Sequence, residues 1–490
     1  MSPRRNTAGC SCPGHAAPGV TRREMLKRSW NGFGLMALSA LMAERNLAGG
    51  EASQTGGRRR LDPSPHFVSR AKNVIFLFMD GGVSHVDSFD PKPKLTELHL
   101  KKAVLSKEHN PTGAWDERKW LGSPWKFERH GGAGLSVSEL FPHTATCVDE
   151  LAVVRSMVSE FPLHSRANLF IHTGSNTAGK PSLGSWVNYG LGSENKNLPG
   201  FVVLHSGMNI PSGMENFSNG FLPATYQATL ARTEGVPIDN LLPADRLSIQ
   251  RAKLDLLGAE DRKFSRSQGG EEAIESAIAN YELAYRMQSL VPDVVDLSTE
   301  SEATKRLYGI DSQEVDKRRF GMECLRARRL VESGVRFVEV LCPNWFGSTG
   351  TWDQHGRLKV GHERNAFNTD QAAAGLIKDL KDRGMLDETL VLWSGEFGRT
   401  PHSPSTDGRD HHPQAFTLWM AGGGIRGGTV YGTSDELGMD VVENPVTIHD
   451  LHATLLHLLG LDHERLTYHF GGRDFRLTDV HGRVLNEIIA

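Results

Sequence analysis

The chain has few cysteines, almost no excess charge of either sign and no compositional mark of a disordered or fibrous protein. Its 490 residues include 5 Cys, and 55 Lys and Arg stand against 58 Asp and Glu. So few cysteines exclude a scaffold held together by disulfides. A net charge of -3 gives no sign of a nucleic-acid partner. With 38% hydrophobic residues, the length suits one large α/β domain or two smaller ones.

The first 50 residues have the pattern of an export signal. Arg22 and Arg23 precede an uncharged stretch from Trp30 to Ala43, which at 14 residues is short for a membrane span of about 20. A basic segment before a short apolar one is typical of a twin-arginine signal. The alternative is an amphipathic first helix, which Gly32 and Gly34 would weaken. We predict a signal over residues 1–48, a linker over 49–70, export by the twin-arginine machinery to the periplasm or the medium, and no stable membrane span.

Beyond residue 70, short apolar runs alternate with segments of helical periodicity. Runs with the length of buried strands are 74–79, 151–154, 201–204, 335–341, 390–393 and 416–420. Apolar residues at three- and four-residue spacing predict helices over 271–290, 316–333, 368–383 and 447–459. This alternation predicts an α/β domain over 71–490, with a mostly parallel central sheet flanked by helices on both faces. Residues 97–134 read as an insertion of turns and short helices.

Carboxylates and imidazoles follow three of the predicted strands. Because the carboxyl ends of parallel strands meet at one edge of a sheet, we expect these side chains to lie close together. The chain is also rich in histidine near its end, with 11 of its 21 His after residue 350. Of the adjacent pair His411 and His412, we favour His412, which precedes Pro413. The predicted metal ligands are Asp80, Asp353, His355, Glu396, His411 and His412.

This set offers oxygen and nitrogen donors and no thiolate, which suits Zn²⁺ or Mn²⁺ better than Ca²⁺. One or two ions fit such a set, and a pair about 3.5–4 Å apart would clamp the two reacting oxygens of an ester. Each residue alone also has an ordinary explanation. Asp80 precedes Gly81 and would suit a turn, Asp353 and His355 would suit a hydrogen-bonded loop, and Glu396 would suit an ion pair with Arg399.

Five motifs occur in a specific order along residues 70–490. They are Asn73 to Pro93, Trp352 to Gly356, Ser394 to Pro401, Gly408 to Pro413 and His449 to Thr454. In these motifs the chain resembles the family called "domain of unknown function 1501", which is similar to the sulfatases and the wider alkaline-phosphatase superfamily. The resemblance implies a sulfatase-like α/β fold with a metal site at the strand ends. It places Asp80, Asp353, His355, Glu396 and one of the two adjacent histidines at metal-ligand positions.

The resemblance fails at the nucleophile. Sulfatases carry a Cys or Ser at the start of a helix that ends in Thr-Gly, and here the segment before Thr173-Gly174 places His164, or Pro162 in another register, in that position. The open alternatives are covalent catalysis by His164, Ser165 or Ser84, and attack by a metal-bound hydroxide. His164 also suits a supporting or capping role at the helix start. Arg166 and Arg399 are candidate anion clamps, or members of ordinary salt bridges.

Together these observations predict an exported, metal-dependent hydrolase of sulfate or phosphate esters. The expected substrate is an ester of a small molecule or a carbohydrate, and no nucleic acid is expected as a partner. The alternative is a non-catalytic protein of the same fold that binds a glycan or a protein partner, which the missing Cys or Ser nucleophile favours.

Overall fold

The computed structural model describes residues 64–107, 109, 117–207, 210–239, 241–243, 245–268, 272–343 and 351–490. The predicted export signal lies outside these residues, as does most of the predicted linker. Among the helices that are described, none combines the length and the apolar character needed to cross a membrane.

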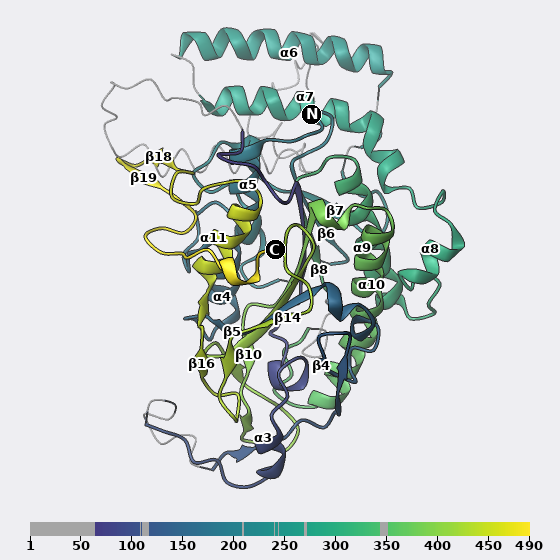
Figure 1. The fold of residues 1–490 in the computed structure, drawn as a ribbon. Helices are drawn as coiled ribbons and strands as arrows, with labels where there is room; N and C mark the ends of the chain where they lie inside the picture. Colours follow the sequence, from purple (N-terminus) through teal and green to yellow (C-terminus); the bar gives the residue numbers. More distant parts are fainter. Residues whose placement is uncertain are drawn as a thin grey trace, which may run out of the picture. The chain divides into compact units, whose positions relative to one another are not determined.

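A nine-stranded sheet forms the centre of the domain (Figure 1). Its order is β14-β5-β13-β9-β1-β8-β6-β7, and β17 also pairs with β5. β13 runs antiparallel to β5 and β9, whereas every other pair in the sheet is parallel. The strands are β1 Asn73–Phe78, β5 Leu151–Val158, β6 Phe201–His205, β7 Thr229–Arg232, β8 Phe337–Leu341, β9 Thr389–Ser394, β13 Phe416–Ala421, β14 Thr429–Tyr431 and β17 Val446–Thr447.

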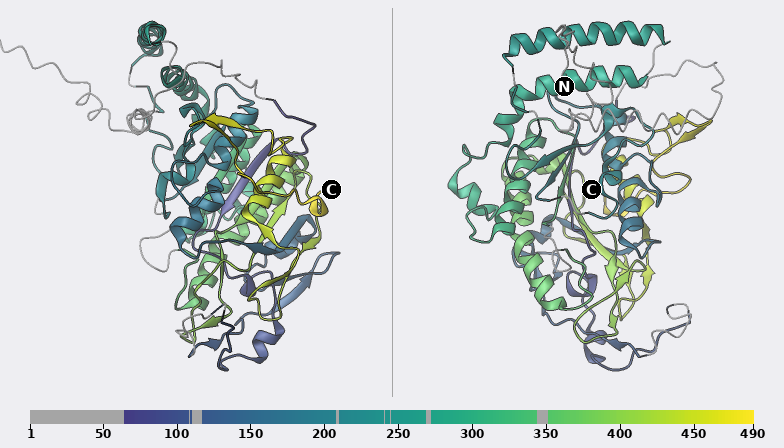
Figure 2. Two further views of the ribbon diagram at one scale, coloured as in Figure 1. Left: turned by 90° about the vertical axis from the view of Figure 1, so that its left-hand side faces the viewer. Right: turned by 180° about the vertical axis from the view of Figure 1, so that it is seen from behind.

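Helices cover both faces of this sheet, as Figures 1 and 2 show. The central strand β1 is apolar throughout and sends alternate residues to opposite faces. Val74, Phe76 and Phe78 belong to one buried core, and Ile75 and Leu77 belong to the other. The first core also holds residues of α4 His164–Thr173, α5 Leu183–Leu191 and α11 Ile448–Leu458, and the second holds residues of α7 Glu272–Val295, α9 Val315–Glu332 and α10 Leu358–Asp382. The predicted fold class, a mostly parallel sheet flanked by helices on both faces, is confirmed.

The largest differences from the predicted elements concern the start of one helix and the inserted segment. Helix α10 begins ten residues before its predicted start. The segment 97–134 contains short strands where turns and short helices were expected, because Gly131 and Gly134, both at positive φ, turn the chain back into an antiparallel hairpin. Further elements of the described residues are α3 Pro93–Glu97, α6 Leu247–Ser267, α8 Glu302–Leu307, β2 Lys119–Trp120, β3 Phe127–His130, β4 Leu135–Ser138, β10 Gly398–Arg399, β11 His402–Ser403, β12 His411–His412, β18 Tyr468–Phe470 and β19 Arg473–Phe475.

Candidate metal centre

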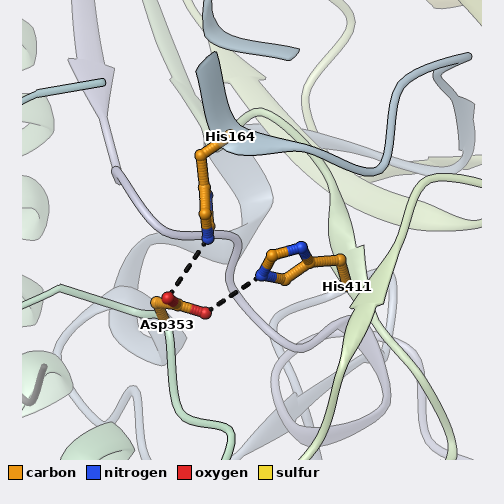
Figure 3. A group of neighbouring side chains, drawn as sticks. All are labelled: His164, Asp353 and His411. Carbon is orange, nitrogen blue, oxygen red and sulfur yellow. Dashed lines mark hydrogen bonds and ion pairs between the residues drawn. The ribbon is translucent and has the colours of Figure 1, made fainter. Parts of the chain in front are cut away.

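Three imidazoles surround the carboxylate of Asp353 at the carboxyl edge of the sheet. His164 Nε2 lies 3.2 Å from Asp353 Oδ2, and His411 Nε2 lies 3.2 Å from Oδ1 (Figure 3). His355 Nε2 lies 3.1 Å from the same Oδ1. One ligand atom each from His164, Asp353 and His411 lie within 4.8 Å of one another. We call these four residues the Asp353 cluster.

Different segments bring these side chains together. His164 is the first residue of α4, His411 lies in the short strand β12, and Asp353 and His355 lie between β8 and α10. Gly81 permits the approach of the Asp353 segment, because a Cβ at this position would lie 2.7 Å from the Asp353 backbone nitrogen, and its φ of +105° strains any other residue. The Trp352 amide accordingly donates to the Asp80 carbonyl at 3.0 Å.

Each of the three imidazoles is oriented through its Nδ1 atom. His164 Nδ1 donates to Glu396 Oε1 at 2.6 Å. His411 Nδ1 donates to the Pro162 carbonyl at 2.6 Å, and His355 Nδ1 donates to Asp410 Oδ1 at 2.7 Å. Because the partners are carboxylate and carbonyl oxygens, Nδ1 carries the proton in every case. The Nε2 atoms are therefore the ones presented to Asp353, which is the arrangement in which histidines bind metals.

The donor set fits a divalent cation. Burial lowers the pKa of His411, which disfavours the charged form of this ring. His411 Nε2 lies 3.0 Å from His355 Nε2 and 3.2 Å from Asp353 Oδ1, so that three potential metal-ligand atoms lie close together. A cation bound here would take its ligands from these side chains. Imidazole nitrogens with one carboxylate suit Zn²⁺ or Mn²⁺, and Ca²⁺ prefers oxygen alone.

Without a cation, the carboxylates hold a proton on His164. Burial by itself lowers the pKa of His164, but the contacts with Asp353 and Glu396 outweigh burial and raise this pKa to about 9. For Asp353, burial raises the carboxyl pKa, but the contacts with His164 and His411 and the charge of Arg399 hold this pKa well below its usual range. The cluster thus already pairs a carboxylate with positive charge, as a cation site requires.

Asp80 and Glu396 lie behind His164. Both side chains are buried, and both Glu396 oxygens accept from the Gly81 amide at 3.1 Å. Asn168, one helical turn after His164 on α4, donates Nδ2 to Asp80 Oδ1 at 3.3 Å. Burial, followed by the nearby Glu396 carboxylate, raises the pKa of Asp80 to about 7. Of the predicted ligands, Glu396 contacts His164 directly and orients it.

The structure does not place Arg399 as the anion clamp that the sequence predicted. Its side chain is completely buried. Nε donates to the Gly82 carbonyl at 3.0 Å, Nη1 to the Arg409 carbonyl at 3.3 Å, and Nη2 to the Gly81 carbonyl and to Asp353 Oδ1, the latter at 2.7 Å. Because the guanidinium is surrounded by protein acceptors, it holds Asp353 in place and presents no face to a substrate.

The structure also separates the two adjacent histidines. His411 joins the Asp353 cluster, whereas His412 is buried, donates Nε2 to the Met439 carbonyl at 2.6 Å and stacks on His85 with ring centroids 6.0 Å apart. Neighbouring residues of a strand face opposite sides, so only one of the pair can reach Asp353. The preference for His412 over His411 is therefore not what the structure shows.

The predicted residues of the first turn of α4 are at the surface. Ser165 and Arg166 are exposed, directly after His164. Ser84 is completely buried, and its hydroxyl donates to Asp87 Oδ2 at 2.5 Å.

Three groups at the site were not predicted from the sequence, namely Asp410, Asn168 and the Pro162 carbonyl. For Asp410, its place directly before the histidine pair was an available signal, since carboxylates commonly orient metal-binding histidines.

The two adjacent histidines give a direct test of this geometry. We expect His411→Ala to weaken binding of Zn²⁺ about 10- to 100-fold or more, because it removes an imidazole that faces Asp353. The matched variant His412→Ala should leave Zn²⁺ affinity within about twofold and instead lower the free energy of unfolding by about 2–4 kcal/mol, because it opens a buried cavity. Titration calorimetry and chemical denaturation measure the two effects, and equal loss of metal in both variants would contradict the geometry.

The fold and the cluster define an α/β protein with a histidine- and carboxylate-lined centre at the carboxyl edge of its sheet. The chain belongs to the family described as "Protein of unknown function (DUF1501)", whose model matches residues 71–489. No curated protein matches the chain.

Several solved structures are similar to the chain. The lipoteichoic acid synthase LtaP from Listeria monocytogenes is 11% identical, with 86% of this chain and 78% of that chain covered and a TM-score of 0.34. The PsFucS1 sulfatase from Pseudoalteromonas sp. is 12% identical, with 88% and 72% covered and a TM-score of 0.33. Alkaline phosphatase from the Antarctic bacterium TAB5 is 9% identical, with 81% and 99% covered and a TM-score of 0.33. Identities this low do not bear on the chemistry of the chain.

Proposed function

We propose that the protein is a metal-dependent hydrolase of sulfate or phosphate esters. The observation that carries this proposal is the convergence of three Nε2 atoms on the Asp353 carboxylate, each imidazole being held by an acceptor at its Nδ1. A Zn²⁺ or Mn²⁺ ion bound there would polarise an ester oxygen and make hydroxide available near neutral pH. The same proposal places the mature chain in the periplasm or the medium, after export by the twin-arginine machinery.

Three groups outside the cluster support its side chains. Glu396 fixes the ring of His164, Asp410 fixes that of His355, and Arg399 holds the Asp353 carboxylate. Arg118, from the inserted segment, pairs with Asp410 and extends this support. Such outer contacts keep metal ligands in one orientation and tune their basicity.

The start of α4 supports an anionic substrate. Leu163 occupies the N-cap position and provides no side-chain cap to the helix. The backbone amides of the first turn therefore remain available beside the cluster, where a helix N-terminus attracts sulfate or phosphate oxygens. The exposed guanidinium of Arg166 lies in the same turn and would add a bidentate contact. Arg166 is thus the proposed anion clamp.

The contacts favour water as the nucleophile. Both ring nitrogens of His164 face carboxylates, which leaves neither directed at a substrate. The Ser84 hydroxyl is buried and engaged by Asp87. Ser165 is exposed, so its contacts do not exclude it as a nucleophile. Under this proposal we expect the variant Ser165→Ala to retain activity.

Metal removal tests the proposal. We expect the purified chain to contain stoichiometric Zn or Mn by elemental analysis, and to lose all hydrolysis after dialysis against EDTA. Adding back Zn²⁺ or Mn²⁺ should restore activity toward at least one member of a panel of aryl sulfates, phosphomonoesters, phosphodiesters and sulfated sugars. A chain with no metal would contradict the site, and a metal-loaded chain inactive on the whole panel would favour the glycan- or protein-binding alternative.

A further inference from the structure

Helix α6 lies on the far side of α7 from the sheet (Figures 1 and 2). It packs along α7 through one face, on which Gly258 and Ser265 are buried and Leu254 is half-buried. Arg251, also on this face, forms a bidentate ion pair with Glu282 of α7 at 2.8 and 2.7 Å. The inner face of α6 is therefore joined to α7 by small and polar residues.

The outer face of α6 carries the large apolar side chains. The exposed fractions are 47% for Ile249, 66% for Leu256, 51% for Leu257 and 53% for Phe264. On an ordinary surface helix the leucines face the protein and the polar residues face solvent, so α6 has the opposite arrangement. A row of large exposed apolar side chains along one helix face, here called the stripe, marks an interaction surface.

This stripe is complementary to itself. Its positions are Ile249, Lys253, Leu256–Leu257, Glu260 and Phe264, at the three- and four-residue spacing of a helix seam. Reading the stripe backwards about the Leu256–Leu257 bond exchanges Ile249 with Phe264 and Lys253 with Glu260. Apolar positions then meet apolar positions, and a cation meets an anion. The centre of this exchange coincides with the middle of α6, which spans Leu247–Ser267.

We propose that the outer face of α6 binds α6 of a second copy, antiparallel and about a two-fold axis. In such an isologous pair each contact occurs twice. Leu256 and Leu257 meet their symmetry mates at the centre, two Lys253–Glu260 ion pairs flank them, and Ile249 contacts Phe264 of the partner helix at each end. This inference is independent of the Asp353 cluster and of the proposed hydrolysis.

The charges on α6 argue against the main alternative occupant. A helix that lies on an anionic membrane has a polar face rich in Lys and Arg. Here Glu260 lies within the stripe, as an ion-paired protein contact requires, and Asp255, which pairs with Arg251 on the same helix, adds a further negative charge to the surface of α6. Lys253 pairs with Asp245 on the surface of its own chain, and both side chains are largely exposed, so this contact is weak and easily exchanged.

Charge reversal provides the test. The purified chain is examined by sedimentation velocity and by light scattering from 1 to 100 µM, and a concentration-dependent dimer is expected. Lys253→Glu and Glu260→Lys should each weaken dimerisation about tenfold or more, because each creates two like-charge contacts. The double variant Lys253→Glu/Glu260→Lys should restore it, since only the antiparallel pairing exchanges these two positions.

Lys94→Glu on α3, which breaks a surface pair with Glu97, is the matched control and should leave the dimer unchanged. A parent chain that stays monomeric at 100 µM overturns the proposal, and so does a dimer that the double variant fails to restore. A monomer that instead co-sediments with phosphatidylglycerol vesicles would assign the stripe to a membrane and equally overturn it. Metal content should be the same in all these variants.

Discussion

Asp353→Asn is expected to abolish stoichiometric metal binding and to reduce ester hydrolysis about a thousandfold. Asp353 is the point on which His164, His355 and His411 converge, and it supplies the one negative charge among these donors. An amide of the same size keeps an acceptor for Arg399 but removes that charge. Loss of the cation removes several kcal/mol of stabilisation from the transition state, and each 1.4 kcal/mol corresponds to about tenfold in rate.

Elemental analysis and steady-state kinetics measure this effect. Asp474→Asn is the matched control, because Asp474 also contacts a histidine, His469 Nδ1 at 2.8 Å, but in an exposed hairpin of β18 and β19. The control should retain metal and activity. If Asp353→Asn kept a full complement of metal with an unchanged rate, the Asp353 cluster would not be the metal centre.

Arg409→Met is expected to lower the free energy of unfolding by about 3–5 kcal/mol. Arg409 lies two residues before His411, and its guanidinium binds Asp87 through Nε–Oδ2 at 2.6 Å and Nη2–Oδ1 at 3.1 Å. Neither side chain is exposed to solvent. Removing the arginine leaves the Asp87 carboxylate buried without its cation, which is the most destabilising change a buried ion pair can undergo.

Urea denaturation measures the loss, and two further variants define its origin. The double variant Asp87→Leu/Arg409→Met should recover most of the stability, because no charge then remains buried. Arg473→Met is the surface control, since its partner Asp479 is half exposed, and it should cost less than about 1 kcal/mol. A loss below about 1 kcal/mol for Arg409→Met would show that the Asp87 carboxylate is solvated or protonated in the folded chain.

Much of the fold follows from local apolar patterns. The run from Val74 to Met79 predicts β1 to within one residue at each end, because a strand buried on both faces needs apolar side chains throughout. Helix α6 was not predicted, since the residues it buries are Gly258 and Ser265 and its leucines face outward. The early start of α10 was missed for a similar reason: its first turns include His362, Glu363 and Arg364 and show no clear apolar stripe.

The sequence indicated which loops lie at the same edge of the sheet, but it did not indicate which way each side chain points. The strand-end rule correctly indicated that Asp353, His355 and Glu396 would be near one another. The choice between His411 and His412 depends on which side of β12 faces Asp353, and that is set by the pairing of β12 with β10, which involves residues far from any local pattern. The role of Arg399 as an anion clamp was predicted wrongly for the same reason. The carbonyl groups that accept from its guanidinium belong to Gly81, Gly82 and Arg409, which no local pattern connects with Arg399.

The contacts of Arg399 also bear on the order in which the chain folds. They join residues up to 318 positions apart, and the cluster itself needs side chains from His164 through His411. Contacts between such distant segments form late, after the intervening chain has been synthesised and the sheet has assembled. No nascent fragment that ends before β12 contains the complete donor set. If the cluster is the proposed metal centre, a protein truncated ahead of residue 411 should therefore fail to bind metal, even where its remaining strands assemble.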